Sequence, residues 1–258
     1  MKYETILYEA EGGIATLTIN RPDVLNALNM QVLAEMLDAI SRIEADEAVK
    51  VVVLTGAGRS FIAGADIALM SGFCVRDGMK FGDMGHAVLK RLEALDKPVI
   101  AAVNGFALGG GTEVSLGCDF VYASTRAKFG QPEVNLGIIP GFGGTQRLAR
   151  LVGEGRALEM LLVGAPIDAA RAFEIGLANR VVEGSALDGA LALADEIAAV
   201  GPEAARACLR AVREGLRLPL GAGLELEARL FGQAFAGDEM REGTAAFMEK
   251  RPPRFAGR

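Results

Sequence analysis

Three short apolar runs constrain the fold of this chain more than any other feature of its sequence. Val51–Leu54, Pro98–Val103 and Phe120–Ala123 lack the alternation of apolar and polar positions that a half-exposed strand shows. Such runs are typical of strands that are buried on both faces. A helix is expected over 81–95, between the first two strands. Because strands that alternate with helices form right-handed crossovers, the sequence predicts an α/β protein with a largely parallel sheet.

Further elements are expected on both sides of these strands. Strands over 3–8 and 14–19 would flank a Gly12-Gly13 hairpin turn, and Asn29 would cap a helix with one apolar face. After Arg147, helices are expected at about 154–163, 168–175, 186–199, 202–215, 221–235 and 238–249. We therefore divide the chain into an α/β core over 1–195 and a C-terminal helical region over 196–258. Apolar positions in this region would serve either an oligomer interface or packing on their own core.

Composition excludes several classes of protein. The chain has 258 residues, 51% of them hydrophobic, and a net charge of −6. This apolar content is too high for a disordered chain. The negative net charge argues against a dedicated nucleic-acid binder, which needs a basic surface. We expect no signal peptide, because the first residues lack its apolar region, and the longest uncharged run, 98–112, is too short to cross a membrane. Cys74, Cys118 and Cys208 lack motif spacing, so free thiols that pack as small apolar residues are expected, in the reducing cytoplasm.

The single histidine, His86, excludes several kinds of catalytic site. An ordinary metal site with histidine ligands needs more than one histidine, and the sequence has no Cys/His zinc pattern. A catalytic triad would have to include His86, but Ser115 lacks the nucleophile-elbow pattern because Glu113 occupies the place of its first glycine. We therefore expect no metal site, and we expect His86 on a helix, at the surface or in packing.

Two glycine-rich loops are candidates for ligand binding. Ala63–Asp66 and Asn104–Gly111 each follow a predicted strand and precede a predicted helix. In an open α/β sheet, ligands bind beyond the carboxyl ends of the strands. Two backbone N–H groups that converge there on one oxygen form an oxyanion hole. The glycine patterns of dinucleotide-binding and P-loop proteins are absent, and glycine loops alone are equally consistent with plain turns.

Two carboxylates accompany these loops. Glu113 directly follows Gly109–Gly111, and Glu133 precedes the apolar run 134–142. An ionised group in an apolar segment is costly unless it has a partner. Two carboxylates in one apolar pocket have separated pKa values, which suits one acid and one base. Taken alone, however, the local pattern favours a helix-dipole role for Glu113 and a capping role for Glu133.

A set of short strings runs in order along almost the whole chain. They are Asn20-Arg21-Pro22, Leu25–Leu28, Phe61–Asp66, Lys97–Gly105, Ala107–Glu113, Cys118-Asp119, Phe129–Glu133, Leu136-Gly137, Pro140-Gly141, Gly143–Leu148 and Glu249–Phe255. In combination they resemble the enoyl-CoA hydratase/isomerase family, the crotonases. The resemblance implies a crotonase-type spiral of ββα repeats, with a C-terminal helical region for oligomerisation and active-site cover. It also implies a homotrimer or homohexamer.

The resemblance further implies a carbon–oxygen lyase that adds water to trans-2-enoyl-CoA and yields 3-hydroxyacyl-CoA. By motif position, the thioester oxygen would accept hydrogen bonds from the N–H groups of Ala65 and Gly110. Glu113 would activate water, and Glu133 would exchange a proton at the α-carbon. The implied substrate-binding residues are Ala63, Gly64, Asp66, Ile67, Gly109 and Gly141. No cofactor is implied, because coenzyme A is part of the substrate.

Three alternatives and two departures from the family pattern remain. An enoyl-CoA isomerase or a dienoyl-CoA hydratase would share the oxyanion hole, although both glutamates together favour hydration. A non-enzymatic RNA-binding relative conflicts with the acidic charge.

Asp23-Val24 replaces a Lys-Ala that is common in the family, so Arg21, Lys97 or a basic tail residue would have to contact the coenzyme A phosphates. The segment 69–85, which includes Met79 and Phe81, would line the acyl pocket or pack in the core.

Overall fold

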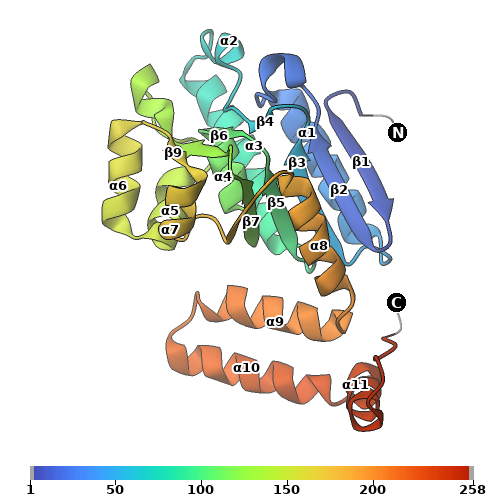
Figure 1. Ribbon diagram of the computed structural model, residues 1–258. Coiled ribbons are helices and arrows are strands. Elements are labelled where there is room, and N and C mark those ends of the chain that lie inside the picture. The colour runs from blue at the N-terminus through green and yellow to red at the C-terminus, as the bar shows by residue number, and fades with distance from the viewer. Residues whose placement is uncertain (1–2, 256–258) are drawn as a thin grey trace.

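The strands of the computed structural model, which describes residues 3–255, separate into two sheets (Figure 1). The larger sheet has the order β1-β2-β3-β5-β7-β10. Its parallel centre consists of β3 (Val51–Gly56), β5 (Val99–Val103) and β7 (Phe120–Ser124), joined at the edge by the short β10 (Arg180–Val182). The three apolar runs therefore form adjacent parallel strands, as predicted.

The smaller sheet contains the short strands that follow β3, β5 and β7 along the chain. β4 (Ser60–Ile62), β6 (Phe106–Leu108) and β8 (Lys128–Gly130) are parallel neighbours, and β9 (Ile167–Asp168) pairs antiparallel with β8. A helix comes after each pair of strands: α3 (Val75–Ala94), α4 (Gly110–Leu116) and α5 (Gly144–Val152). The chain thus repeats a ββα unit three times, and the crotonase-type spiral is confirmed.

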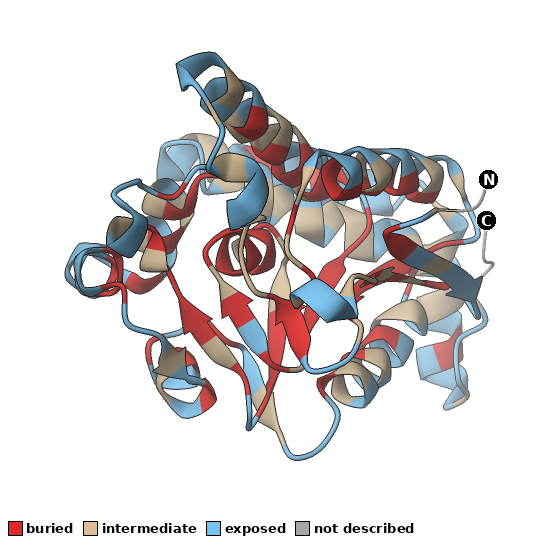
Figure 2. Cartoon of the chain, turned by 90° about the horizontal axis from the view of Figure 1, so that it is seen from above, coloured by how far each residue is buried: buried red, intermediate tan, exposed pale blue. Residues whose placement is uncertain are grey.

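The central strands lack an apolar–polar alternation because each of their faces meets a separate core. In β3, Val52 and Leu54 point into the main core, whereas Val51 and Val53 point into a second one. The second core is covered by α8 (Ala186–Ala198), whose alanines at every fourth position let the helix lie close to the sheet. Buried residues accordingly occupy both the strands and the inward helix faces (Figure 2).

The N-terminal elements agree with the sequence analysis except at their ends. β1 (Ile6–Glu11) and β2 (Ile14–Ile19) form the expected antiparallel hairpin, with positive φ at both turn glycines. The short η1 (Pro22–Val24) precedes α1 (Met30–Ala45), which begins where predicted because the Asn29 side chain accepts a hydrogen bond from the Val32 N–H.

Several elements differ from the expectation. α3 begins six residues earlier than predicted. Its first turn shows no apolar period, and it is capped because Asp77 accepts a hydrogen bond from the Cys74 N–H. The strands of the smaller sheet span only two or three residues, too few to show a period of two, and were not predicted. Neither were α2 (Ile67–Met70), η2 (Pro132–Leu136) and α5.

The helices after residue 153 lie within two residues of their predicted bounds. They are α6 (Glu154–Val163), α7 (Ala169–Glu174), α8, α9 (Pro202–Gly215), α10 (Leu220–Ala234) and α11 (Asp238–Glu249). The expected division at 195 lies inside α8, which packs on the sheet. In Figure 1, α9–α11 project away from the sheets as a separate layer.

A largely buried ion pair of α9 fastens this layer to the rest of the chain, and a more exposed one joins Arg206 to Asp96. The Arg213 guanidinium of α9 donates to both carboxylate oxygens of Asp119, at 2.6 to 2.9 Å, and to the carbonyl oxygen of Leu95. Leu95 and Asp119 precede β5 and β7. The layer is therefore attached at the amino ends of the parallel strands, whereas the glycine loops lie beyond β4 and β6.

All three cysteines are free thiols, as expected. Only Cys118 packs against the main core, however, and Cys74 and Cys208 are exposed, so the packing expectation fails for those two. Within residues 3–255, no helix is both long and apolar enough to span a bilayer.

Candidate active site

The two glycine loops meet beyond the ends of β4 and β6. A Cβ atom added to Gly109 would lie 3.8 Å from the Cα of Gly64 and 2.8 Å from Glu133 Oε1. Both glycines have a positive φ, which side chains disfavour. The first loop is fixed by Leu28, whose N–H donates to Gly64 and whose carbonyl accepts from Asp66. The fold thus brings both loops and Glu133 together.

The amides of Ala65 and Gly110 are available to a ligand. Among the described residues, neither N–H donates to a protein acceptor. Gly110 is the first residue of α4, where the helical ladder supplies no acceptor. The structure therefore leaves unpaired the two N–H groups that the sequence analysis named, one on each of the loops that meet.

Glu113 is held deep beside these amides. Its side chain is almost fully buried on α4, and its Oε1 accepts hydrogen bonds from the N–H groups of Phe142 at 2.8 Å and Gly144 at 2.6 Å. Burial raises the pKa of the carboxyl, while the two amide bonds and the Arg147 charge oppose that rise. Among residues 3–255, no hydrogen bond reaches the second carboxylate oxygen, which can therefore bind a water molecule.

Glu133, in the first turn of η2, is the second carboxyl of the site. It is 9% exposed, and burial raises its pKa to about 7, with the nearby Glu113 charge acting in the same direction. The amide nitrogen of Gln131, in the orientation that satisfies its neighbours, lies 3.0 and 3.1 Å from the two Glu133 oxygens. One carboxyl fixed by amides and another that titrates near neutrality are suited to act as base and acid.

Gln131 is a site residue that the sequence analysis did not select. It is completely buried, and a Cβ atom on Gly144 would meet both the Gln131 amide and Glu113 Oε1. The Gln131 side chain therefore extends from Glu133 to the surroundings of Glu113. Its only signal in the sequence is its place two residues before Glu133, because an uncharged amide does not stand out.

The remaining predicted site residues surround this centre. Asp66 caps α2 and forms a 3.3 Å ion pair with Arg21. Ile67 is exposed at the start of α2, and the Ala63 N–H donates to the Leu25 carbonyl. Gly141 precedes the loop that binds Glu113, and space is open where its side chain would be.

Aromatic rings close one side of the site. The Phe142 ring fills the space beside Gly110 and Gly85, and it meets the Phe81 ring edge to face at 5.1 Å; Phe73 continues the stack at 5.7 Å. Of the segment 69–85, Phe81 is part of the main core and contacts Phe142, whereas Met79 is 66% exposed.

Lys97 is not available to a coenzyme A phosphate. It is buried, and its ammonium donates to the carbonyl oxygens of Ile43, Glu44 and Asp46 at the end of α1. The expectation that it could replace the missing phosphate contact is therefore wrong. His86, the only histidine, lies on α3 beside Gly143. Within residues 3–255, no three His, Cys, Asp or Glu side chains gather as metal ligands.

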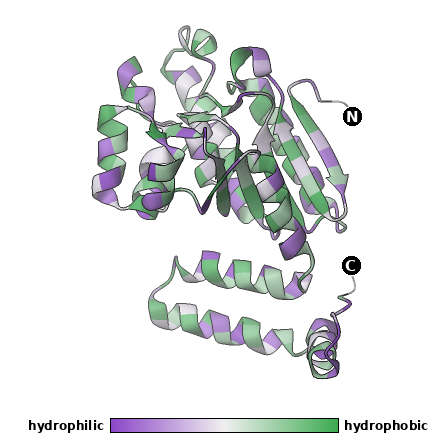
Figure 3. Cartoon of the chain, viewed as in Figure 1, coloured by the Kyte–Doolittle hydropathy of each residue, from purple (hydrophilic) through white to green (hydrophobic). Residues whose placement is uncertain are grey.

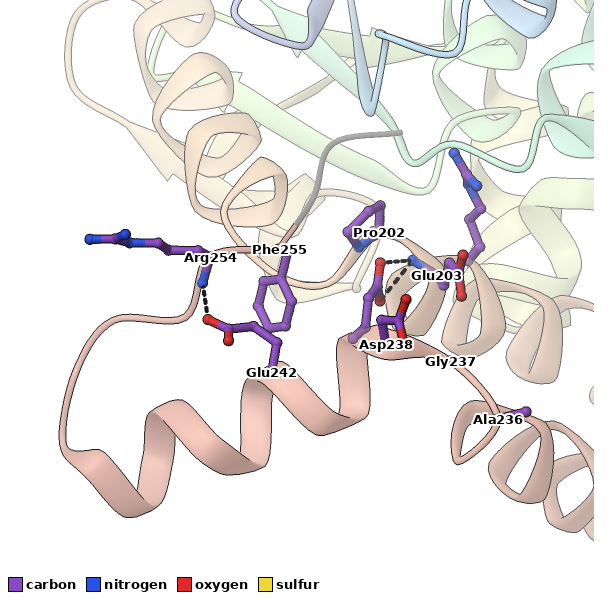
Figure 4. Close-up of a pocket in the computed structure, with 10 residues that line it drawn as sticks. Pro202, Glu203, Ala236, Gly237, Asp238, Glu242, Arg254 and Phe255 are labelled. Carbon is purple, nitrogen blue, oxygen red and sulfur yellow. Dashed lines mark hydrogen bonds between the residues drawn. The ribbon is translucent and has the colours of Figure 1, made fainter.

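A separate cavity of about 290 Å³ lies in the C-terminal layer, between α9 and α11 (Figure 4). Pro202, Glu203, Glu242 and Phe255 line it. Two of its carboxylates have partners in the chain: Glu239 accepts from the N–H groups of Glu203 and Ala204, and Glu242 accepts from that of Arg254. The cavity is therefore a feature of helix packing and lies apart from the two catalytic candidates.

Known proteins resemble this chain over its full length. The sequence pattern of the family described as Enoyl-CoA hydratase/isomerase matches residues 9–258. A crotonyl-CoA hydratase of Syntrophomonas wolfei is 47% identical over 99% of both chains, and a short-chain-enoyl-CoA hydratase of Clostridium acetobutylicum is 48% identical over 97% of both. The crystal structure of an enoyl-CoA hydratase from Bacillus anthracis superimposes with a TM-score of 0.95, at 37% identity, covering 99% of this chain and 100% of that one. The chain belongs to the enoyl-CoA hydratase/isomerase family.

Proposed function

We propose that this protein adds water across the double bond of a trans-2-enoyl-CoA and releases a 3-hydroxyacyl-CoA. The observation that carries the proposal is the pairing of two buried carboxyls, Glu113 and Glu133, with two unpaired backbone amides on adjoining loops. The names of the two hydratases that are 47% and 48% identical support the same reaction.

The geometry suggests how each group acts. The thioester oxygen would accept hydrogen bonds from the N–H groups of Ala65 and Gly110. Glu113, with Oε1 fixed by two amides, would hold a water molecule on Oε2 and take its proton as the water oxygen bonds to C3. The π electrons then move toward C2 and the thioester oxygen, and the two N–H groups stabilise the resulting enolate.

Glu133 would complete the addition by giving a proton to C2. A carboxyl whose pKa is about 7 is still partly protonated at neutral pH, as this step requires. The proton that Glu113 takes and the one that Glu133 gives are then balanced through solvent. Acid, base and oxyanion donors all come from the chain, so the proposed chemistry needs no further group. An isomerase would move one proton and would leave Glu113 without a task.

The site favours a short acyl chain. The edge-to-face rings of Phe142 and Phe81 fill the space beside Gly110, next to the place of the thioester oxygen. A substrate with few carbons beyond C3 avoids displacing these rings. The names of both relatives, crotonyl-CoA hydratase and short-chain-enoyl-CoA hydratase, are consistent with this inference. For the rest of coenzyme A, we propose contact with the loop 63–67, where Arg21 is the nearest cation to Asp66.

We also propose that the chain works as a homotrimer or homohexamer in the cytoplasm. Large apolar side chains of the C-terminal layer are exposed, among them Leu216, Leu220, Phe231, Phe247 and Met248. Hydrophobic and hydrophilic stretches alternate along the helices of this layer (Figure 3). Large apolar side chains that gather on one part of a protein often mark a surface that a partner covers. Because α9 is fastened at the amino ends of the strands, the cover over each site would come from another copy. Light scattering during gel filtration measures the mass directly.

The experiment that tests the function is hydration of crotonyl-CoA, followed by loss of the enoyl-thioester absorbance. Longer trans-2-enoyl-CoAs and a 3-enoyl-CoA are assayed beside it. We expect fast hydration of the four-carbon substrate and slower hydration as the chain lengthens. A protein that shifts the double bond of the 3-enoyl-CoA but does not hydrate crotonyl-CoA would contradict the proposal.

A further inference from the structure

Arg147 holds the loop that binds Glu113. This loop, Phe142–Gly144, donates two N–H groups to the Glu113 carboxylate. On its other side, the Phe142 carbonyl accepts a hydrogen bond of 2.9 Å from Arg147 Nη1. The guanidinium fills the space beside Gly143, which has a positive φ of 104°, so no side chain fits there. The conformation of the loop therefore depends on where the Arg147 guanidinium lies.

Arg147 is in turn fixed by a residue of another helix. Its Nε lies 2.5 Å from Glu93 Oε1, in the last turns of α3, and both side chains are largely shielded from solvent. The backbone adds a second restraint, because the Arg147 N–H donates to Gly143. A single guanidinium thus links α3 to α5 and to the loop between η2 and α5.

We propose that Arg147, fixed by Glu93, is a positioning residue that keeps the Phe142–Gly144 loop in the geometry that binds and ionises Glu113. The inference rests on the proposed hydration, in which Glu113 is the base. Neither Arg147 nor Glu93 touches the place of the substrate. Glu93 acts through Arg147, and Arg147 acts through the two amides that fix Glu113 Oε1 and through its own charge.

The charges around Glu113 make this role measurable. Among the described residues, the charged side chains near Glu113 are Arg147 on α5 and Glu133 on η2, and Glu93 on α3 is paired with Arg147. The His86 side chain, also on α3, lies beside Gly143. β4 and β6 also pack against α4 and carry no titratable side chain. Arg147 lowers the pKa of Glu113, so its removal raises that pKa. Because the base must be ionised, the acidic limb of the rate profile then moves to higher pH.

The test compares four variants over a range of pH with crotonyl-CoA. Arg147→Met should lower kcat by roughly tenfold to a hundredfold, with KM almost unchanged. It should also shift the acidic limb of the profile of kcat against pH to higher pH by about one unit. Glu93→Gln keeps the cation and should lower kcat by only about threefold to tenfold. Arg147→Lys should keep the limb in place but lower kcat, since one ammonium cannot bond Glu93 and Phe142 together. Arg150→Met, one turn further along α5, is the matched control and should behave as wild type.

A second measurement separates this proposal from the proposed function. Carboxyl ¹³C NMR, with Glu113 assigned through Glu113→Gln, gives the pKa of Glu113 without turnover. If wild type fails to hydrate crotonyl-CoA but Arg147→Met raises that pKa, the hydration proposal is wrong and the positioning role stands. If wild type is active while Arg147→Met changes neither kcat nor the pKa, the positioning role is wrong. If Arg147→Met does not fold, full kcat in both Arg147→Lys and Glu93→Gln overturns the role equally.

Discussion

Replacing Glu133 by glutamine should stabilise the folded protein at pH 8 while it abolishes turnover. The Glu133 carboxyl is 9% exposed, and its pKa is about 7 in the fold against an ordinary 4.5, chiefly because of burial. The folded state therefore holds the proton more tightly than the unfolded state does. The fold has its full stability below about pH 4.5 and loses part of it as the pH rises to about 7.

The magnitude follows from these two pKa values. The difference, 7 − 4.5 = 2.5, corresponds to about 3 kcal/mol at about 1.36 kcal/mol per pH unit. The hydrogen bonds from the Gln131 amide favour the ionised form and offset about 1 kcal/mol. About 2 kcal/mol of destabilisation thus remains at pH 8. For a chain of this length, that equals roughly 4–8 °C in the melting temperature.

The assay is thermal unfolding of wild type and Glu133→Gln at pH 5 and pH 8. We expect the variant to melt higher at pH 8 and to differ by less than about 1 kcal/mol at pH 5, where the folded carboxyl is already protonated. Glu159→Gln, on an exposed face of α6, should show no such dependence. Turnover of the Glu133 variant should fall by about 10²–10⁴. A variant that melts lower than wild type at pH 8, or gains equally at both pH values, would refute the reasoning.

Three further substitutions test other parts of the structure. Glu113→Gln keeps an oxygen for the amides of Phe142 and Gly144, so it should fold normally yet lose about 10²–10⁴ in kcat; a loss below tenfold contradicts its role as base. Gly144→Ala would place a methyl group 3.0 Å from Glu113 Oε1 and should lower kcat by about tenfold or more, whereas Gly155→Ala, with open space around it, should not. Arg213→Met should destabilise the protein to urea by about 2 kcal/mol, because its ion pair with Asp119 is about one-fifth exposed, whereas Arg210→Met, in an exposed pair, should change little.

Much of the fold can be predicted from the local pattern of apolar and polar residues. The apolar runs predicted the central strands, because β3 and β5 each pack side chains into two cores and can have no polar face. The helices after residue 153 were predicted within two residues, since amphipathic helices repeat the same face every three or four positions. The smaller sheet was missed, because strands of two or three residues are defined by their neighbours and not by their own sequence.

The candidate site divides in the same way. The sequence by itself determined the residue types: two glycine loops, two glutamates in apolar segments, and a single histidine without a zinc pattern or a nucleophile elbow. Only the tertiary structure decided what they do together. Glu113 receives its hydrogen bonds from amides 29 and 31 residues away, and Gln131 donates to the Glu133 carboxyl without any pattern that marks it. Lys97, which looked available for a phosphate in the sequence, donates its hydrogen bonds to carbonyl oxygens at the end of α1. The physical reason is that burial and hydrogen-bond partners, which set the pKa and orientation of a side chain, come from segments that meet only when the chain folds.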